Sequence, residues 1–403
     1  MSRMQFEIIA RDKKTKARIF KFKTIKTPFF MPVATKATGK FYDSNDMKKI
    51  KVKAIIANAL LLSLEPSAAV IKSLGGIHRF MNFKGIIFTD SGGFQMYSEH
   101  LFLGINENGI RFRNPFTGQR ILCTPEKDMQ IQLDIASDVA MCLDDMPLYP
   151  AKKERLIQSV KRTIAWAIRC KRYHDKHNNI NQLLFGIVQG GTDNSLRKIC
   201  AKKLSTLKFP GYAIGGLAIG EPENLMWQAT KVTLKYIPEK TPKYLMGLGK
   251  PYQLLKAISL GIDIFDSRYP TKTARHNQVF TFSDGTLKLQ RKIYKDDKNP
   301  IDKTCNCPVC QNYSRAYLHH LIKIKEPNVK RLLSLHNLYF YQRLMEKAQE
   351  SIPESIDHII NIFLPSHIMQ VMDTIIENSK DPHLVEKARL NKMTWSYKSG
   401  RKI

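Results

Sequence analysis

The sequence has 403 residues, 43% of them hydrophobic, so it can bury the core of one large domain with an attachment, which argues against global disorder. It has no apolar run of about eighteen residues, the length that crosses a membrane, and no signal-peptide pattern, so we expect a soluble, cytoplasmic protein. Lys and Arg number 65 against 35 Asp and Glu, and this net charge of +30 fits a polyanionic partner, a lysine-rich solvated surface, an acidic protein partner or a membrane surface.

Short apolar runs recur in the first two thirds of the chain, each followed by a polar or helical stretch. They have the composition of strands buried on both faces and lie at residues 27–33, 53–59, 85–90, 138–144, 183–189, 211–217, 243–249 and 261–266. Helical patterns lie between them at residues 124–137, 151–174, 194–207 and 250–260. These alternating units predict a (β/α)8 TIM barrel of the α/β class, with a doubly wound open sheet as the competing architecture.

Three segments depart from this repeat. Residues 93–124 alternate polar with apolar residues and contain turn signals, which predicts a small β insertion in the barrel domain at 1–270. Residues 271–345 begin with a basic, turn-rich stretch and a predicted hairpin around Asp284, and they include a cysteine cluster, so we expect a separate subdomain. Residues 346–403 are expected to form C-terminal helices and a basic tail without a clear helical pattern.

The cysteines indicate a metal site. Three of the seven stand in a C-x-C-x-x-C motif: Cys305, Cys307 and Cys310. The odd total, with the other four scattered singly, argues for reduced thiols rather than disulfides. A closed site needs a fourth ligand, and His336 on a predicted amphipathic helix is preferred to His319 and His320; a hydrogen-bonded core histidine is the alternative interpretation of His336. A Cys3His set predicts one structural Zn²⁺ per subunit, so the chemistry must be sought elsewhere.

Polar residues stand where several predicted strands end, and in a barrel these ends carry the reactive groups. Asp90, Asp144 and Asp266 would meet at one rim if the strand assignments hold. Each carboxylate alone could cap a turn or pair with a nearby cation, but three together predict a functional site, because carboxylates at the ends of apolar strands are costly unless used or paired. No phosphate-binding loop is found, since the glycine spacing at 215–220 ends in Glu221 rather than Lys and Ser or Thr.

Five motifs, in one order along the chain, carry a resemblance to a known family. They are FTDSGGFQ, FGIVQGG, YAIGGLAIGEP, YLMGLGKPYQLLKAISLGIDIFDSRYPTKTAR and CNCPVC with a later His. From about residue 28 to 345 the chain is similar to tRNA-guanine transglycosylases, the queuine tRNA-ribosyltransferase family, of the bacterial type. The resemblance implies a (β/α)8 barrel with a zinc-binding subdomain inserted near the C-terminus, and a homodimer. It also implies that the wobble guanine at position 34 of tRNAs with GUN anticodons (Asp, Asn, His, Tyr) is exchanged for a 7-deazaguanine base, queuine or its precursor preQ1, in queuosine biosynthesis.

The resemblance implies a role for each site residue. Asp266 would be the nucleophile that forms a covalent ribosyl-aspartate intermediate, and Asp90 the general acid and base. Asp144 would read the edge of the base. The rest of the base pocket would consist of Gln189, Gly216, Leu217, Met246 and Phe94. Lys272 and Arg275 would bind phosphates of the tRNA anticodon loop.

The sequence also departs from the family pattern. Asp145 and Met146 follow Asp144 where bacterial members have Glu-Cys, and Phe94 stands where the aromatic residue is often Tyr. Ile219 is bulky, as in bacterial members, whereas the eukaryotic catalytic subunit has glycine, so preQ1 is preferred to queuine and both stay open. A non-catalytic tRNA-binding subunit is disfavoured by the three aspartates, while a hydrolase on the same barrel stays possible; a zinc-dependent hydrolase would need an open metal site.

Overall fold

The computed structural model describes residues 6–92, 101–363, 372, 376, 379 and 381–399 of the chain. Eight parallel strands form one sheet in the order β4-β14-β13-β12-β11-β10-β6-β5. Their bounds are β4 Phe29–Met31, β5 Ala54–Asn58, β6 Ile86–Asp90, β10 Val139–Met141, β11 Leu183–Val188, β12 Gly211–Ile214, β13 Lys243–Leu245 and β14 Ile264–Asp266. Each strand lies within one of the eight runs predicted from the sequence.

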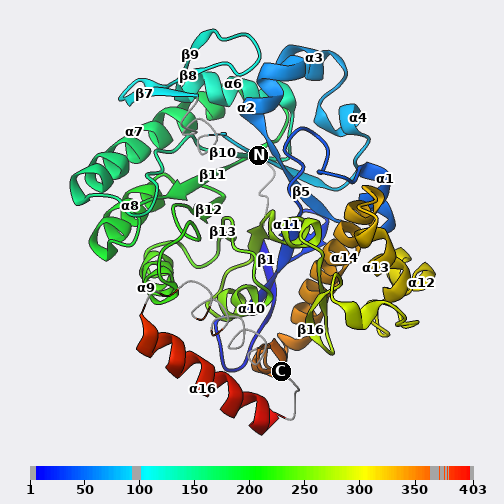
Figure 1. The fold of residues 1–403 in the computed structure, drawn as a ribbon. Coiled ribbons are helices and arrows are strands. Elements are labelled where there is room, and N and C mark those ends of the chain that lie inside the picture. Colours follow the sequence, from blue (N-terminus) through cyan, green and yellow to red (C-terminus); the bar gives the residue numbers. More distant parts are fainter. Residues whose placement is uncertain are drawn as a thin grey trace.

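The two ends of the sheet meet. Val33, just past β4, pairs with Ile56 of β5 in a parallel bridge, and the N–H of Ala34 donates to the carbonyl of Ile56 at 2.8 Å. Since all eight strands are parallel and the first lies beside the second, the sheet is a barrel (Figure 1). The predicted (β/α)8 fold is confirmed, and the open-sheet alternative is wrong.

Helices surround the barrel and connect its strands (Figure 1). They are α1 Ser44–Lys49, α2 Ala59–Leu62, α3 Ala68–Ser73, α4 Ile77–Met81, α6 Pro125–Ile135, α7 Lys153–His177, α8 Asn194–Thr206, α9 Glu223–Leu234, α10 Pro251–Ser259 and α11 Tyr269–Arg275, with an irregular turn at Ser63–Ser67. In α7 the buried positions Thr163, Trp166, Cys170 and His174 recur every three or four residues. That spacing places them on one face of the helix, and this face covers the sheet.

A small antiparallel sheet that we did not predict precedes the barrel. It consists of β1 Glu7–Arg11, β2 Arg18–Phe22 and β3 Ile25–Lys26. Phe22 is fully buried, and its ring centroid lies 5.6 Å from that of Phe29, 6.0 Å from Phe88 and 6.3 Å from Phe185. Because Phe29 begins β4, this aromatic cluster fills the barrel toward the amino ends of its strands and leaves the carboxyl ends for the site.

The segments predicted as an insertion and a subdomain contain the expected strands. In the described part of 93–124, β7 Phe102–Asn106, β8 Gly109–Arg113 and β9 Arg120–Cys123 form an antiparallel sheet. In the subdomain, β15 Gln278–Thr281 and β16 Gly285–Lys288 form the hairpin predicted around Asp284. The helical elements that follow are the 3-10 turn Lys292–Tyr294, α12 Pro308–Asn312, α13 Arg315–Lys323 and α14 Asn328–Ser351.

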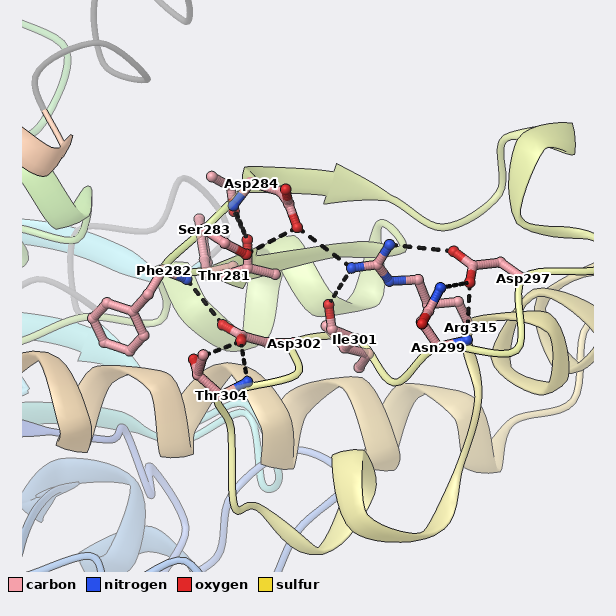
Figure 2. A network of polar contacts seen from close by, with 12 residues as sticks. Thr281, Phe282, Ser283, Asp284, Asp297, Asn299, Ile301, Asp302, Thr304 and Arg315 are labelled. Carbon is pink, nitrogen blue, oxygen red and sulfur yellow. Dashed lines mark hydrogen bonds and ion pairs between the residues drawn. The ribbon is translucent and has the colours of Figure 1, made fainter. Parts of the chain in front are cut away.

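One arginine ties the hairpin to the loop that precedes the cysteines (Figure 2). The guanidinium of Arg315 donates to Asp297 Oδ2 at 3.2 Å and to the carbonyl of Ile301 at 2.8 Å. It also reaches Asp284 Oδ2 in the hairpin turn at 3.5 Å. The planar group thus holds three chain segments in one arrangement, which matches the fixed geometry of its donors.

The described C-terminal residues differ from the expectation of a basic tail without a helical pattern. Helix α16 spans Pro382–Ser399, and Asp381 Oδ1 accepts the N–H groups of His383 at 3.0 Å and Leu384 at 3.3 Å. An Asp cap followed by Pro at the first helical position is a start signal, but the lack of an apolar stripe hid the helix. None of the helices in the described ranges is long and apolar enough to cross a membrane.

Candidate active site and metal centre

The barrel brings the three predicted carboxylates together. Asp90 ends β6, Asp266 ends β14, and Asp144 follows β10, so all three stand at the carboxyl rim. Burial raises the pKa of Asp90 to about 7, and the negative charges of Asp266 and Asp144 act in the same direction. Burial also raises the pKa of Asp144 to about 7, with the charge of Asp145 adding to the effect. The three groups therefore form one electrostatically coupled site.

Asp266 is oriented by two hydrogen bonds to one of its oxygens. Its Oδ1 accepts the hydroxyl of Tyr244 at 2.6 Å and the N–H of Gly247 at 2.9 Å. Burial raises the pKa of Asp266, and both hydrogen bonds oppose that rise. Among the described residues nothing donates to Oδ2, which leaves that oxygen available to a substrate. Sequence reasoning missed Tyr244, because a tyrosine inside an apolar strand is typical of a core position.

Asp90 has a buried amide beside it. Its Oδ1 accepts the N–H of Gly92 at 3.1 Å, and its Cα partner across the β5–β6 pair is Asn58. Asn58 is 1% exposed, its Oδ1 accepts the N–H of Leu61 at 2.7 Å, and a hydrogen bond from its side chain to Asp90 opposes the rise in the pKa of that carboxyl. Asn58 therefore belongs to the site as a buried neighbour of Asp90. In the sequence, Asn58 could have been recognised as a polar residue near the end of the apolar run at 53–59.

Asp144 and Gln189 bind each other. The amide nitrogen of Gln189 donates to Asp144 Oδ2 at 2.6 Å, while its buried Oε1 has no partner among the described residues. A Cβ on Gly215 would lie 2.6 Å from Nε2 of Gln189, and one on Gly216 2.3 Å from its Oε1, so a side chain at either position would displace the amide of Gln189; Gly216 also has a φ of +65°, which favours glycine. The glycine pair thus lets the backbone approach the side chains of the pocket.

For the remaining predicted residues the structure gives the position in the fold and the burial. Leu217 is buried directly after the glycine pair, and Met246 is half-buried just past β13. Lys272 and Arg275 lie on α11, the helix that follows Asp266, with Lys272 exposed and Arg275 half-buried. Their contact with RNA stays a prediction. Phe94 lies outside the described residues.

The predicted metal ligands converge. Nδ1 of His336 lies 3.9, 3.5 and 3.3 Å from the Sγ atoms of, in order, Cys305, Cys307 and Cys310. A tetrahedral zinc ion, with Zn–S about 2.3 Å and Zn–N about 2.0 Å, separates such atoms by about 3.5 Å. The Nε2 of His336 lies 2.8 Å from the carbonyl of Phe280, which fixes the ring with Nδ1 toward the thiols. The four side chains could hold a metal ion. His319 instead pairs with the carbonyl of Leu289 at 2.8 Å.

A buried carboxylate holds the loop that carries the first cysteine (Figure 2). Asp302 is 1% exposed; its Oδ2 accepts the N–H of Phe282 at 3.0 Å, and its Oδ1 accepts the N–H of Thr304 at 2.8 Å. The side chain of Asp302 therefore links the loop before Cys305 to the hairpin by a hydrogen bond. These bonds place the thiol where the other ligands meet.

Comparison with known proteins identifies the family of the chain. A family model described as queuine tRNA-ribosyltransferase matches residues 12–361. The queuine tRNA-ribosyltransferase of Thermoanaerobacter pseudethanolicus is 44% identical over 356 residues, which cover 87% of this chain and 94% of that protein. That of Natranaerobius thermophilus is 42% identical over 355 residues (87% and 95%), and that of Staphylococcus aureus 44% over 331 residues (82% and 86%). The chain belongs to the queuine tRNA-ribosyltransferase family.

Proposed function

We propose that this chain is a tRNA-guanine transglycosylase that exchanges guanine 34 of tRNAs with GUN anticodons (Asp, Asn, His, Tyr) for a 7-deazaguanine base in queuosine biosynthesis. The observation that carries the proposal is the pair Asp90 and Asp266 on one rim beside the pocket of Asp144 and Gln189. Family membership supports tRNA and guanine-type bases as substrates.

The reaction is a double displacement. Asp266 attacks C1′ of the ribose while the bond from C1′ to guanine breaks, and Asp90 donates a proton to the departing base. The ribosyl-aspartate ester then reacts with the incoming base, whose ring N–H returns the proton to Asp90 as the new bond from C1′ to nitrogen forms and Asp266 leaves. Two inversions retain the configuration of the sugar, and one glycosidic bond replaces another, so no nucleoside triphosphate is consumed. A pKa of about 7 suits Asp90 to both proton transfers.

The residues of the base pocket match the hydrogen-bond donors and acceptors on the edge of the base. Asp144 accepts from the ring N1–H and the exocyclic amine of the base, and Gln189 turns its amide from Asp144 toward the O6 carbonyl, which the N–H of Gly216 also meets. The buried Oε1 of Gln189, which has no partner among the described residues, supports a side chain that changes partner when a base binds. Ile219 limits the space beside the pocket, which favours preQ1 over queuine.

Three further properties belong to the proposal. The four-ligand cluster binds a structural Zn²⁺, because a closed Cys3His set leaves no open position for substrate. The enzyme acts as a homodimer, as the family resemblance implies. It works in the cytoplasm, where none of the seven cysteines is oxidised to a disulfide.

The decisive experiment incubates the purified protein with a GUN-anticodon tRNA and labelled guanine. Label in the tRNA supports exchange. Abasic tRNA without label would instead show a hydrolase, and binding without either product would show a non-catalytic subunit. Competition between preQ1 and queuine, repeated with Ile219→Gly, then tests the choice of base: we expect preQ1 to win in the wild type and queuine to gain in the variant.

A further inference from the structure

A buried carboxylate with two arginines stands next to the base-reading aspartate. Asp145 is 0% exposed, although it directly follows Asp144 in the chain. Arg155 donates to both oxygens of Asp145, at 2.8 Å to Oδ2, and Arg162 donates to Oδ2 at 3.1 Å. We call Asp145, Arg155 and Arg162 the Asp145 clamp. Because Asp145 is covered, it cannot touch a substrate and can act only through its neighbours.

The backbone of the same residue is also held. The N–H of Asp145, part of the peptide that joins it to Asp144, donates to Oγ1 of Thr163 at 3.1 Å. Its carbonyl accepts the hydroxyl of Ser159. Both arginines and both hydroxyl groups come from α7, so one helix holds the side chain, the N–H and the carbonyl of a single loop residue.

We propose that the Asp145 clamp is a positioning device for base recognition: α7 sets the carboxylate of Asp144 against the incoming base by holding the next residue. This inference rests on the proposed function. Replacing a buried ion pair by apolar residues is often neutral or stabilising, so stability alone gives little reason for the clamp. Two-point bonds from a rigid guanidinium to a carboxylate do fix geometry, and an Asp144 held out of place would bind the base less tightly.

Arg162 has a second partner, outside the clamp, in the β insertion. Arg162 also donates from Nε to Glu107 Oε1 at 2.9 Å, in the turn between β7 and β8. The side chain of Glu107 is 72% exposed, so this outer pair is solvated and contributes little. Farther along α7, Arg169 donates to Glu126 at 2.7 Å and makes no bond to Asp145. Glu107 and Arg169 therefore supply matched controls.

The test measures kcat and KM for the base at saturating tRNA. We expect Asp145→Asn and Arg162→Met to raise KM for the base at least about tenfold, with kcat changed less than about threefold, because Asp144 holds the base equally in the ground and transition states. Asp145→Glu, which keeps the charge that both arginines bind, should lie closer to the wild type than Asp145→Asn. Glu107→Gln and Arg169→Met should stay within about twofold of the wild type in KM.

The outcomes separate this inference from the proposed function. If the wild type exchanges no guanine, the proposed function fails first. If it does exchange guanine, an unchanged KM for the base in folded Asp145→Asn overturns the clamp. The clamp is also overturned if Asp145→Asn lowers kcat alone, in proportion to a smaller folded fraction of the protein. Should Asp145→Asn not fold, Arg155→Lys keeps the charge but loses the two-point geometry, and it must raise KM for the base. An unchanged KM in that variant overturns the clamp as well.

Discussion

Asp266 presents one bonded and one available oxygen to the rim, which suits a nucleophile that must attack from a fixed direction. Since Oδ1 is held by Tyr244 and Gly247, we expect Asp266→Ala to lose exchange by at least about a thousandfold. Binding of tRNA should persist within about threefold, because one carboxylate is a small part of an interface dominated by phosphates. Labelled-guanine incorporation and filter binding measure the two effects.

A trapped intermediate gives a second measure of the same residue. Wild-type protein denatured during turnover should carry RNA on a denaturing gel, and Asp266→Ala should not. Tyr244→Phe serves as the control, since it removes one hydrogen bond to Oδ1 but leaves the carboxylate. Turnover of Asp266→Ala at the wild-type rate would reject the assignment.

Two carboxyl groups of the site, Asp90 and Asp144, have a pKa of about 7, and the proposed reaction needs them in opposite protonation states. Asp90 must carry a proton to release guanine, and that form is lost as the pH rises through its pKa. Asp144 must be ionised to accept from the base, and that form is lost as the pH falls through its pKa. We therefore expect a bell-shaped profile of kcat/KM for tRNA centred near pH 7, with its limbs belonging to the coupled pair. A flat rate from about pH 5 to pH 9 would contradict this arrangement.

At the scale of elements, a metal ion held by the four clustered side chains would link two helices of the subdomain. His336 stands on α14, and the three thiols stand in and before α12. We expect His336→Ala to lose most of about one zinc per chain and to lower the melting temperature of the subdomain, because binding free energy at a structural site is also folding free energy. Metal analysis and thermal unfolding measure both effects.

His319→Ala is the matched control for that experiment. His319 is buried in the same subdomain and bonded to a carbonyl, yet it stands outside the cluster. Its variant should keep the metal. If His336→Ala also retained bound zinc and unchanged stability, the closed Cys3His site would be wrong, and an open site would have to be considered.

For the whole molecule, the net charge of +30 acquires a partner once tRNA is the substrate. Each neutralised phosphate should steepen the plot of log Kd against log salt by about 0.7–0.9. We expect Lys272→Ala and Arg275→Ala each to reduce that slope by the contribution of one phosphate, about 0.7–0.9, since both residues lie on the helix after Asp266. Filter binding from about 50 to 200 mM salt measures the slope, with Lys198→Ala on α8 as control. Equal slopes in all four proteins would contradict the proposed contact.

The sequence by itself determined the eight strands, the β-rich segment at 93–124, the hairpin and the four side chains of the Cys3His cluster, which could hold a metal ion. Apolar runs and ligand spacing are local patterns, and each element needs only its own residues to be recognised. The helix α16 shows the limit of that method, because its start signal stood in a stretch without an apolar stripe.

Only the tertiary structure decided which polar groups meet. The bond from Tyr244 to Asp266 joins two strands, and the Asp145 clamp joins a loop to a helix. The pairing of β13 with β14 and the packing of α7 against the loop after β10 bring these groups within hydrogen-bonding distance, and no local pattern encodes those pairs. The carboxylates at the strand ends were readable from the sequence, whereas the groups that orient them depended on the packing of the whole barrel.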